Sequence, residues 1–202
     1  GSGKSTLVKL VPRFYDVDMG SILVDGVDIR HMTQEELRKK IGYVPQEALL
    51  FTGTIAENIR FGKEEAGAEE GRRAAETAQA LDFVTAMPDD FDSLVAQGGA
   101  NLSGGQKQRL AIARALVRQP EIYIFDDSFS ALDFRTDARL RRALKEETTK
   151  ATMLIVAQRV TTVMDADQII VLEKGAVAGI GTHKELMKTC NVYREIVLSQ
   201  VA

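Results

Sequence analysis

The sequence predicts an α/β fold with a mostly parallel sheet that carries helices on both faces. Two observations support this prediction. Short, continuous apolar runs at 121–126 and 152–157 have the length and composition of strands that are buried on both faces. Amphipathic segments separate such runs along the chain, as in strand–helix–strand units. The block 64–120 interrupts this alternation because it is mainly helical, and we interpret it as an inserted helical lobe.

Local signals give the order of the elements. Helical periodicity and capping residues predict helices, whereas apolar runs between turn residues predict strands. Helices are expected over 5–15, 33–40, from about 54, and over 66–87, 106–119, 136–147 and 183–200. Strands are expected over 21–26, 41–44, 121–126 and 152–157, with a hairpin over 169–180. Pro12 bends or ends the first helix because proline has no backbone N–H. Thr33 and Glu36 have the spacing of a capping box.

Composition fits a globular protein of one domain, or of one domain with a lobe. The chain has 202 residues and is 45% hydrophobic, which is enough for a core of that size. Its net charge of −3 gives no basic surface for nucleic acid. The single cysteine, Cys190, excludes an internal disulfide, and we interpret it as a small filler residue near the C-terminus. No apolar run reaches the ~18 residues that a membrane span needs.

The first six residues match the end of a phosphate-binding loop. Gly1-Ser2-Gly3-Lys4-Ser5-Thr6 fits the pattern G-x-x-x-x-G-K-[ST]. In this pattern Gly3 lets the backbone wrap phosphates, Lys4 reaches the β- and γ-phosphates, and the Ser5 hydroxyl binds Mg²⁺. The first glycine of the pattern would precede Gly1, so we interpret the sequence as a fragment cut inside this loop. A Gly/Ser tag remnant is the alternative, which the apolar helical run after Thr6 makes weaker.

A second glycine-rich motif lies before a basic, apolar helix. It reads Leu102-Ser103-Gly104-Gly105-Gln106, and the strand at 121–126 follows it and ends in Asp126 and Asp127. Two glycines let a backbone approach a phosphate closely, and a helix N-terminus adds free N–H groups and a positive dipole end. Taken alone, the motif also fits an ordinary serine-glycine turn before a helix.

In this order, the phosphate loop, the LSGGQ motif and the strand ending in Asp126 resemble the ATP-binding cassette (ABC) ATPases. Further stretches resemble ABC exporters. They are Pro45-Gln46 with Phe51-Thr-Gly-Thr-Ile-x-Glu-Asn-Ile (the Q-loop), Ser130-Ala-Leu-Asp133 (the D-loop) and Gly181-Thr-His-Lys-Glu-Leu. The resemblance covers about 1–200. It implies a RecA-like P-loop NTPase core in two parts, 1–63 and 121–202, around a helical signature lobe at 64–120, and it implies ATP and Mg²⁺ as cofactors.

The resemblance also implies roles for individual residues. Ser5, Gln46 and Asp126 would hold Mg²⁺, and Gln46 would sense the γ-phosphate. The nucleotide contacts would come from Gly1, Ser2, Gly3, Lys4, Ser5, Thr6, Gln46, Ser103, Gly104, Gly105, Gln106 and Asp133. Simpler readings remain open, because Asp126 also suits a helix N-cap and Asp133 the first turn of a helix. His31 and His183 receive no chemical role.

Two positions depart from the pattern of the active family members. The residue after the Mg²⁺ aspartate is normally a glutamate that acts as general base, whereas here it is Asp127. Its shorter side chain falls short of the attacking water, and a misplacement of about 1 Å costs roughly 10²-fold in rate. A histidine normally follows the strand at 152–157, whereas here Gln158 precedes Arg159. Glutamine donates a hydrogen bond but carries no proton between groups. Gln97 is a milder departure, which we treat as variation.

This pattern resembles the degenerate half of a heterodimeric ABC exporter. Asp127 and Gln158 would form an impaired catalytic set, with Gln46 as the third catalytic residue. The intact LSGGQ would serve the ATP site of a second ABC domain. The resemblance implies a membrane domain fused upstream, a place at the cytoplasmic face of the cell membrane, and no nucleic-acid partner. A regulatory half that binds ATP without hydrolysing it is an open alternative. A chromosome-structure or DNA-repair ABC ATPase is a weaker one, because the chain has no long heptad run and only one cysteine.

Overall fold

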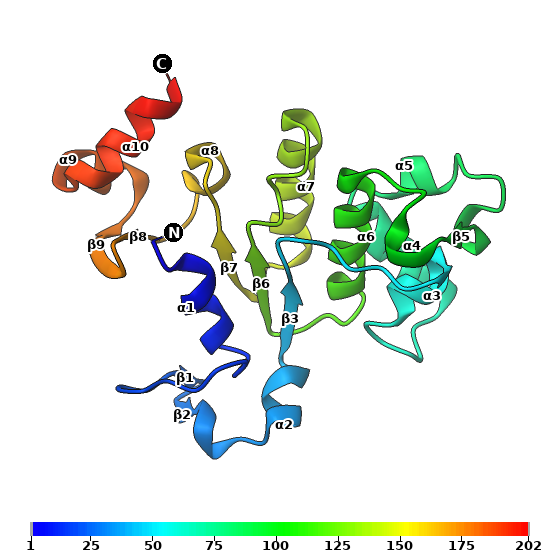
Figure 1. The fold of residues 1–202 in the computed structure, drawn as a ribbon, viewed down its shortest axis with the longest axis horizontal. Helices are drawn as coiled ribbons and strands as arrows, with labels where there is room; N and C mark the ends of the chain where they lie inside the picture. Colours follow the sequence, from blue (N-terminus) through cyan, green and yellow to red (C-terminus); the bar gives the residue numbers. More distant parts are fainter. Residues whose placement is uncertain (1, 202) are drawn as a thin grey trace.

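The computed structural model describes residues 2–201, with three parallel strands at its centre (Figure 1). These strands lie in the order β3 (Ile41–Val44), β6 (Ile122–Asp126) and β7 (Thr152–Val156). Ile41 lies opposite Ile122, and Asp126 lies opposite Val156. Because parallel strands end at the same edge of a sheet, the segments that follow β3, β6 and β7 meet there. The predicted α/β fold with a parallel sheet is confirmed.

The remaining elements surround this sheet. The helices are α1 (Lys4–Leu10), α2 (Gln34–Lys39), α3 (Ile55–Arg60), α4 (Ala68–Thr77), α5 (Leu81–Val84), α6 (Gly104–Leu116), α7 (Phe134–Glu147), α8 (Val160–Val163), α9 (His183–Thr189) and α10 (Asn191–Val201). Short strand pairs are β1 (Leu23–Val24) with β2 (Val27–Asp28), β4 (Gly53–Thr54) with β5 (Leu94–Val95), and β8 (Ile169–Glu173) with β9 (Ala176–Gly181). None of the helices in residues 2–201 is both long and apolar enough to cross a membrane.

Both faces of the central sheet are covered. Successive side chains of a strand point to opposite faces, and β6 follows this rule. Ile124 belongs to a buried cluster with Val8 of α1, whereas Phe125 belongs to another with Leu110 of α6 and Leu140 of α7. Each of these side chains is at most 9% exposed. The sequence of β6 is apolar at successive positions because its side chains contribute to buried clusters on both faces of the sheet.

The helical lobe lies at one end of the molecule (Figure 1). It contains α4, α5 and α6, and α3 packs against both α4 and α6 although it precedes residue 64. The bounds of the lobe at 64 and 120 therefore remain a prediction. The single helix expected over 66–87 is wrong, because Gln79 takes a left-handed backbone conformation (φ 58°) between α4 and α5.

The first and the last of the expected helices also differ from the prediction. The first helix ends at Leu10 instead of residue 15, because Pro12 cannot continue it and Arg13 turns left-handed (φ 53°). The final helix is two helices, α9 and α10, since Cys190 between them is extended. Cys190 is 5% exposed and packs in a third buried cluster, which confirms its filler role. The predicted capping box is confirmed, with the Thr33 hydroxyl accepting from the Glu36 N–H at 3.2 Å.

Candidate nucleotide-binding site

A pocket of about 240 Å³ lies at the edge of the sheet where β3, β6 and β7 end. The loop residues Ser2 to Thr6 form one side of it. Its other side comes from the segments that follow the three strands: Gln46 after β3, Asp127 after β6, and Gln158 after β7. Gly1, the first residue of the predicted phosphate loop, lies outside the described residues. The pocket therefore joins residues that the sequence places more than a hundred positions apart.

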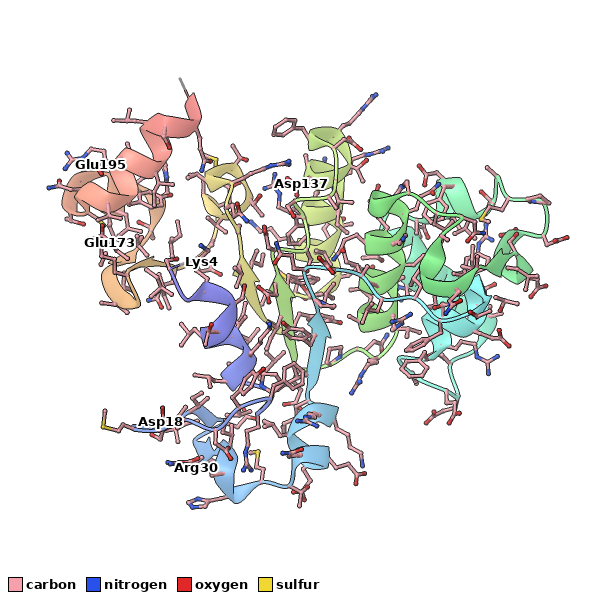
Figure 2. All side chains as sticks on the ribbon, viewed as in Figure 1. Lys4, Asp18, Arg30, Asp137, Glu173 and Glu195 are labelled. Carbon is pink, nitrogen blue, oxygen red and sulfur yellow. The ribbon has the colours of Figure 1, made fainter. Side chains whose placement is uncertain are left out.

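The loop at the start of α1 has the backbone that phosphate binding needs. Gly3 is left-handed (φ 91°), a conformation that L side chains rarely adopt. A Cβ there would meet no atom closer than 4.0 Å, so the conformation and not a lack of space requires glycine. Lys4 follows at the N-terminal end of α1, as Figure 2 shows. Its Nζ donates to Ser2 Oγ at 3.2 Å, which leaves two of its three N–H donors for phosphate oxygens.

The carboxylate of Asp126 connects the sheet to this loop. Ser5 Oγ donates to Asp126 Oδ1 at 2.6 Å, and the Tyr43 hydroxyl donates to Oδ2 at 3.0 Å. Asp126 is 2% exposed. Burial, and then the hydrogen bond to Asp126, raises the pKa of Tyr43 well above its usual value, so Tyr43 remains a neutral donor. Both oxygens are therefore occupied by β3 and α1 partners, and this contact pattern differs from that of a helix N-cap.

The residues around Asp126 suit a magnesium ion. Asp126 and Asp127 are both at least 94% buried, and no described lysine or arginine forms an ion pair with either. Buried negative charge without a cation is costly, so this pair favours a bound divalent ion. The Ser5 hydroxyl, the Asp126 carboxylate and the Gln46 amide oxygen are the hard oxygen donors that Mg²⁺ prefers. The described residues contain no cluster of three acidic, histidine or cysteine ligands.

Asp127 is the point where the three candidate catalytic side chains meet. The Gln158 amide donates to Asp127 Oδ2 at 2.7 Å, and the Gln46 amide donates to the same oxygen at 3.3 Å. The backbone of Asp127 is left-handed (φ 50°), and its N–H donates to the Val156 carbonyl oxygen at 3.0 Å. Aspartate tolerates this conformation better than longer side chains do. The three residues that the sequence analysis singled out therefore form one hydrogen-bonded group.

The signature motif lies elsewhere. Its Ser103 caps α6, where the hydroxyl accepts from the Gln106 N–H at 3.2 Å and the Gln106 side chain accepts from the Ser103 N–H at 2.9 Å. None of Ser103, Gly104, Gly105 and Gln106 lines the pocket of their own chain. In Figure 1 the start of α6 lies in the helical lobe and away from the start of α1. The structure therefore does not bring the signature and the phosphate loop of one chain together.

Asp133, the last residue of the predicted D-loop, caps a helix. Its Oδ1 accepts from the N–H groups of Thr136 at 2.9 Å and Arg135 at 3.0 Å. These bonds, first that of Thr136, lower the pKa of the Asp133 carboxyl. The Asp133 carboxylate therefore acts locally as the N-cap of α7, and its contact with nucleotide stays a prediction. The D-loop also lies close to the signature, because a Cβ added to Gly105 would be only 3.3 Å from the Ala131 carbonyl oxygen.

Two residues that support the site gave no signal in the sequence. One is Tyr43, which binds Asp126 as described above. The other is Gln108 of α6, which is 2% exposed and donates to the Pro45 carbonyl, next to Gln46, at 3.1 Å. These hydrogen bonds span 83 and 63 positions of the chain, so no local spacing reveals them. His183, which has no predicted role, contacts Tyr193 and lies outside the pocket.

Known proteins are similar to this chain in sequence and in fold. The family model "ABC transporter" matches residues 1–130, which is more than half of the chain. An uncharacterized ABC transporter ATP-binding protein, YfiB of Bacillus subtilis, is 50% identical over 200 residues that cover 99% of this chain and 35% of that protein. An ATP-dependent lipid A-core flippase of Methylococcus capsulatus is 45% identical over 201 residues, which cover 99% of this chain and 33% of the flippase.

A solved structure agrees with the sequence comparison. A bacterial Atm1-family ABC exporter with ATP bound superposes with a TM-score of 0.96 at 42% identity, and the match covers 99% of this chain and 35% of the exporter. The chain thus spans about a third of the length of these proteins. Together with the phosphate loop and the Asp126 site, the matches show that the chain belongs to the ABC transporter family, as an ATP-binding domain of the exporter type with the ABC ATPase fold.

Proposed function

We propose that this chain is the ATP-binding part of an exporter, placed at the cytoplasmic face of the cell membrane. In this role, ATP binding and hydrolysis in the pocket drive the movement of a substrate across the membrane. The pocket supports the nucleotide role, because the phosphate loop, Lys4 and Gln46 line it, and the buried Asp126 accepts a hydrogen bond from the lining residue Ser5. The longer exporter-type relatives support the membrane role.

We further propose that this chain's own ATP site hydrolyses slowly. The observation that carries this proposal is the convergence of Gln46 and Gln158 on one oxygen of Asp127, at 3.3 and 2.7 Å. Both side chains that meet Asp127 are amides, and an amide can orient a group by a hydrogen bond but cannot relay a proton. The short Asp127 side chain then has to act as general base without a proton-carrying partner, which makes it a weak one. The phosphate-loop residues 2–6, Lys4 among them, all line the pocket, so the site retains ATP while turning it over slowly.

The partner in this proposal is a second ABC ATP-binding domain that pairs head to tail with the chain, as in a heterodimer. The isolated signature supports it, because the LSGGQ residues lie outside the pocket of their own chain. Gly104 and Gly105 begin α6, where N–H groups without helical partners suit a phosphate. The signature then completes the partner's ATP site, and the partner's signature completes this one.

An exposed apolar surface supports a contact with the membrane domain. It consists of Leu49, Phe51, Phe61 and Leu94, all exposed. The rings of Phe51 and Phe61 lie 4.5 Å apart, and Leu94 is paired with Thr54 just beyond Phe51. This surface continues the segment that begins at Gln46, so a contact on it acts close to the nucleotide. We propose that a membrane domain of the same exporter covers it.

Single-turnover ATP hydrolysis by the assembled, full-length exporter tests these proposals. Each ATP site is disabled in turn, here by Lys4→Ala, so that the remaining site reports alone. We expect slow hydrolysis at the site of this chain and fast hydrolysis at the other. Equal rates at both sites would replace the heterodimer with a symmetric pair that uses an aspartate base. Binding of ATP without any hydrolysis at this site would favour the regulatory alternative.

A further inference from the structure

Gln200, near the end of α10, holds the backbone on both sides of Arg159. Its Nε2 donates to the Gln158 carbonyl oxygen at 2.7 Å, and its Oε1 accepts from the Val160 N–H at 2.8 Å. One amide side chain thus satisfies an acceptor and a donor that lie two residues apart in the chain. The segment 158–160 is therefore attached to a helix that begins some thirty residues later.

These contacts fall on the loop that carries the switch residue. Gln158 follows β7, and its own amide donates to Asp127 Oδ2 at 2.7 Å. Arg159 is the N-cap residue of α8 but offers no side-chain cap, so the first N–H groups of α8 need other partners. Gln200 supplies one of them at Val160. The same side chain therefore fixes the start of α8 and the carbonyl group of the switch residue.

The helix that carries Gln200 is itself anchored. Tyr193 of α10 lies in a buried cluster with Val160, Leu186 and Cys190. The Tyr193 hydroxyl also lies 2.8 Å from His183 Nδ1 at the start of α9. Figure 1 shows α8 next to the α9–α10 pair, at the opposite end of the molecule from the helical lobe. The packing of α9 and α10 therefore holds the backbone of Gln200 in place.

We propose that Gln200 is a positioning residue for ATP hydrolysis. Through it, α10 sets the place of the Gln158 backbone, and the Gln158 amide in turn meets Asp127 at the pocket. A displacement of α10 moves the switch residue without touching the phosphate loop, which makes the C-terminal helix a point at which turnover is controlled. This inference rests on the proposal that the pocket hydrolyses ATP.

The test compares Gln200→Ala with Ser199→Ala in the full-length exporter whose second ATP site is disabled. Ser199 is the matched control, because it is exposed and its hydroxyl donates only within α10, to the Ile196 carbonyl. We expect Gln200→Ala to lower the single-turnover rate about tenfold. A misplacement of about 1 Å costs roughly 10²-fold in rate, and the loss of Gln200 should move the switch residue by less than that. The affinity for ATP should stay within about twofold, because no phosphate-loop contact changes.

A double variant separates positioning from general stability. If Gln200 acts through Gln158, Gln200→Ala causes no further loss when Gln158→Ala is already present. A merely structural role predicts the same loss in both backgrounds, and that result would overturn the inference. An unchanged rate in Gln200→Ala would overturn it as well.

Hydrogen exchange of the backbone keeps the inference distinct from the proposed function. In the ATP-bound protein, Gln200→Ala should speed exchange at the Val160 N–H and leave the Met164 N–H, which is bound within α8, as slow as before. If the parent site shows no hydrolysis at all, slow turnover is refuted as a function, and this exchange measurement then decides alone. Unchanged exchange at Val160 would show that α10 does not hold the switch loop.

Discussion

Replacing Asp127 with glutamate tests whether reach alone limits hydrolysis at this site. The added methylene extends the side chain by about 1.5 Å along its bond. The structure sets two limits on the benefit. Gln158 Nε2 lies only 2.7 Å from Asp127 Oδ2, so a longer side chain must displace the Gln158 amide. The backbone at this position is left-handed (φ 50°), a conformation that costs a residue other than glycine roughly 1–2 kcal/mol.

These limits give the expected size of the effect. A well-placed general base contributes about 10²–10⁴ in rate. Crowding against Gln158 and the strained backbone shift the new carboxylate from its best position, and a shift of about 1 Å removes roughly 10² of that gain. We therefore expect Asp127→Glu alone to raise the rate about tenfold. Gln158→His removes the crowding amide and adds a group that can carry a proton.

The assay is single-turnover phosphate release by the full-length exporter with its second ATP site disabled. The two single variants, the double variant and the parent are compared at saturating ATP. The double variant should exceed the product of the two single effects, because groups that act as a unit are not additive. The reasoning is refuted if Asp127→Glu alone reaches the rate of the double variant. Simple multiplication of the single effects would show that the two positions act independently.

Three further predictions concern binding, asymmetry and stability. Lys4→Ala should weaken ATP binding at this site at least about tenfold, since hydrogen bonds to charged groups stabilise by roughly 1.5–3 kcal/mol. The control Lys9→Ala lies on the same helix but outside the pocket and should leave the affinity unchanged. Equilibrium ATP binding checks both variants, and equal affinities would count against the phosphate-loop assignment. Ser103→Arg should abolish most transport, while Asp127→Asn keeps much of it; equally severe losses would mean that this site carries the hydrolysis. Arg114→Lys should lower the thermal unfolding midpoint of the domain, because lysine cannot reproduce the planar set of bonds at 2.8–2.9 Å that the guanidinium makes; an unchanged midpoint would contradict this.

The sequence predicted the parts of the fold that depend on local spacing. The capping box at Thr33 and the apolar run of β6 are complete within a few residues, so each could be read directly. The turn after Leu10 was harder, because the sequence shows that Pro12 disturbs a helix but not where the helix stops. Parallel strand order places Gln46, Asp127 and Gln158 at one edge of the sheet, where all three line the pocket, and their catalytic roles stay a prediction.

The contacts that hold the site in place could not be predicted in this way. Tyr43 looks like any aromatic residue of a buried strand, and Gln200 like any polar residue on a terminal helix. Their roles come from hydrogen bonds that span 83 and about forty positions, to Asp126 and to the switch loop. Such contacts depend on how the layers stack, which no single segment encodes. The residues that carry the chemistry of the site are therefore easier to predict from the sequence than the residues that hold them in position.

The two attachments of α6 to the segment after β3 have a mechanical consequence. Gln108 donates to the Pro45 carbonyl at 3.1 Å, directly before Gln46, and Arg114 donates to the Leu49 carbonyl at 2.8 Å, three residues after Gln46. Helix α6, which carries the signature at its N-terminus, is therefore attached at two points to the segment that contains Gln46. In the proposed dimer, a shift of this segment on ATP binding would be passed on to the LSGGQ residues of the same chain. The proposal then predicts that the occupancies of the two ATP sites are linked.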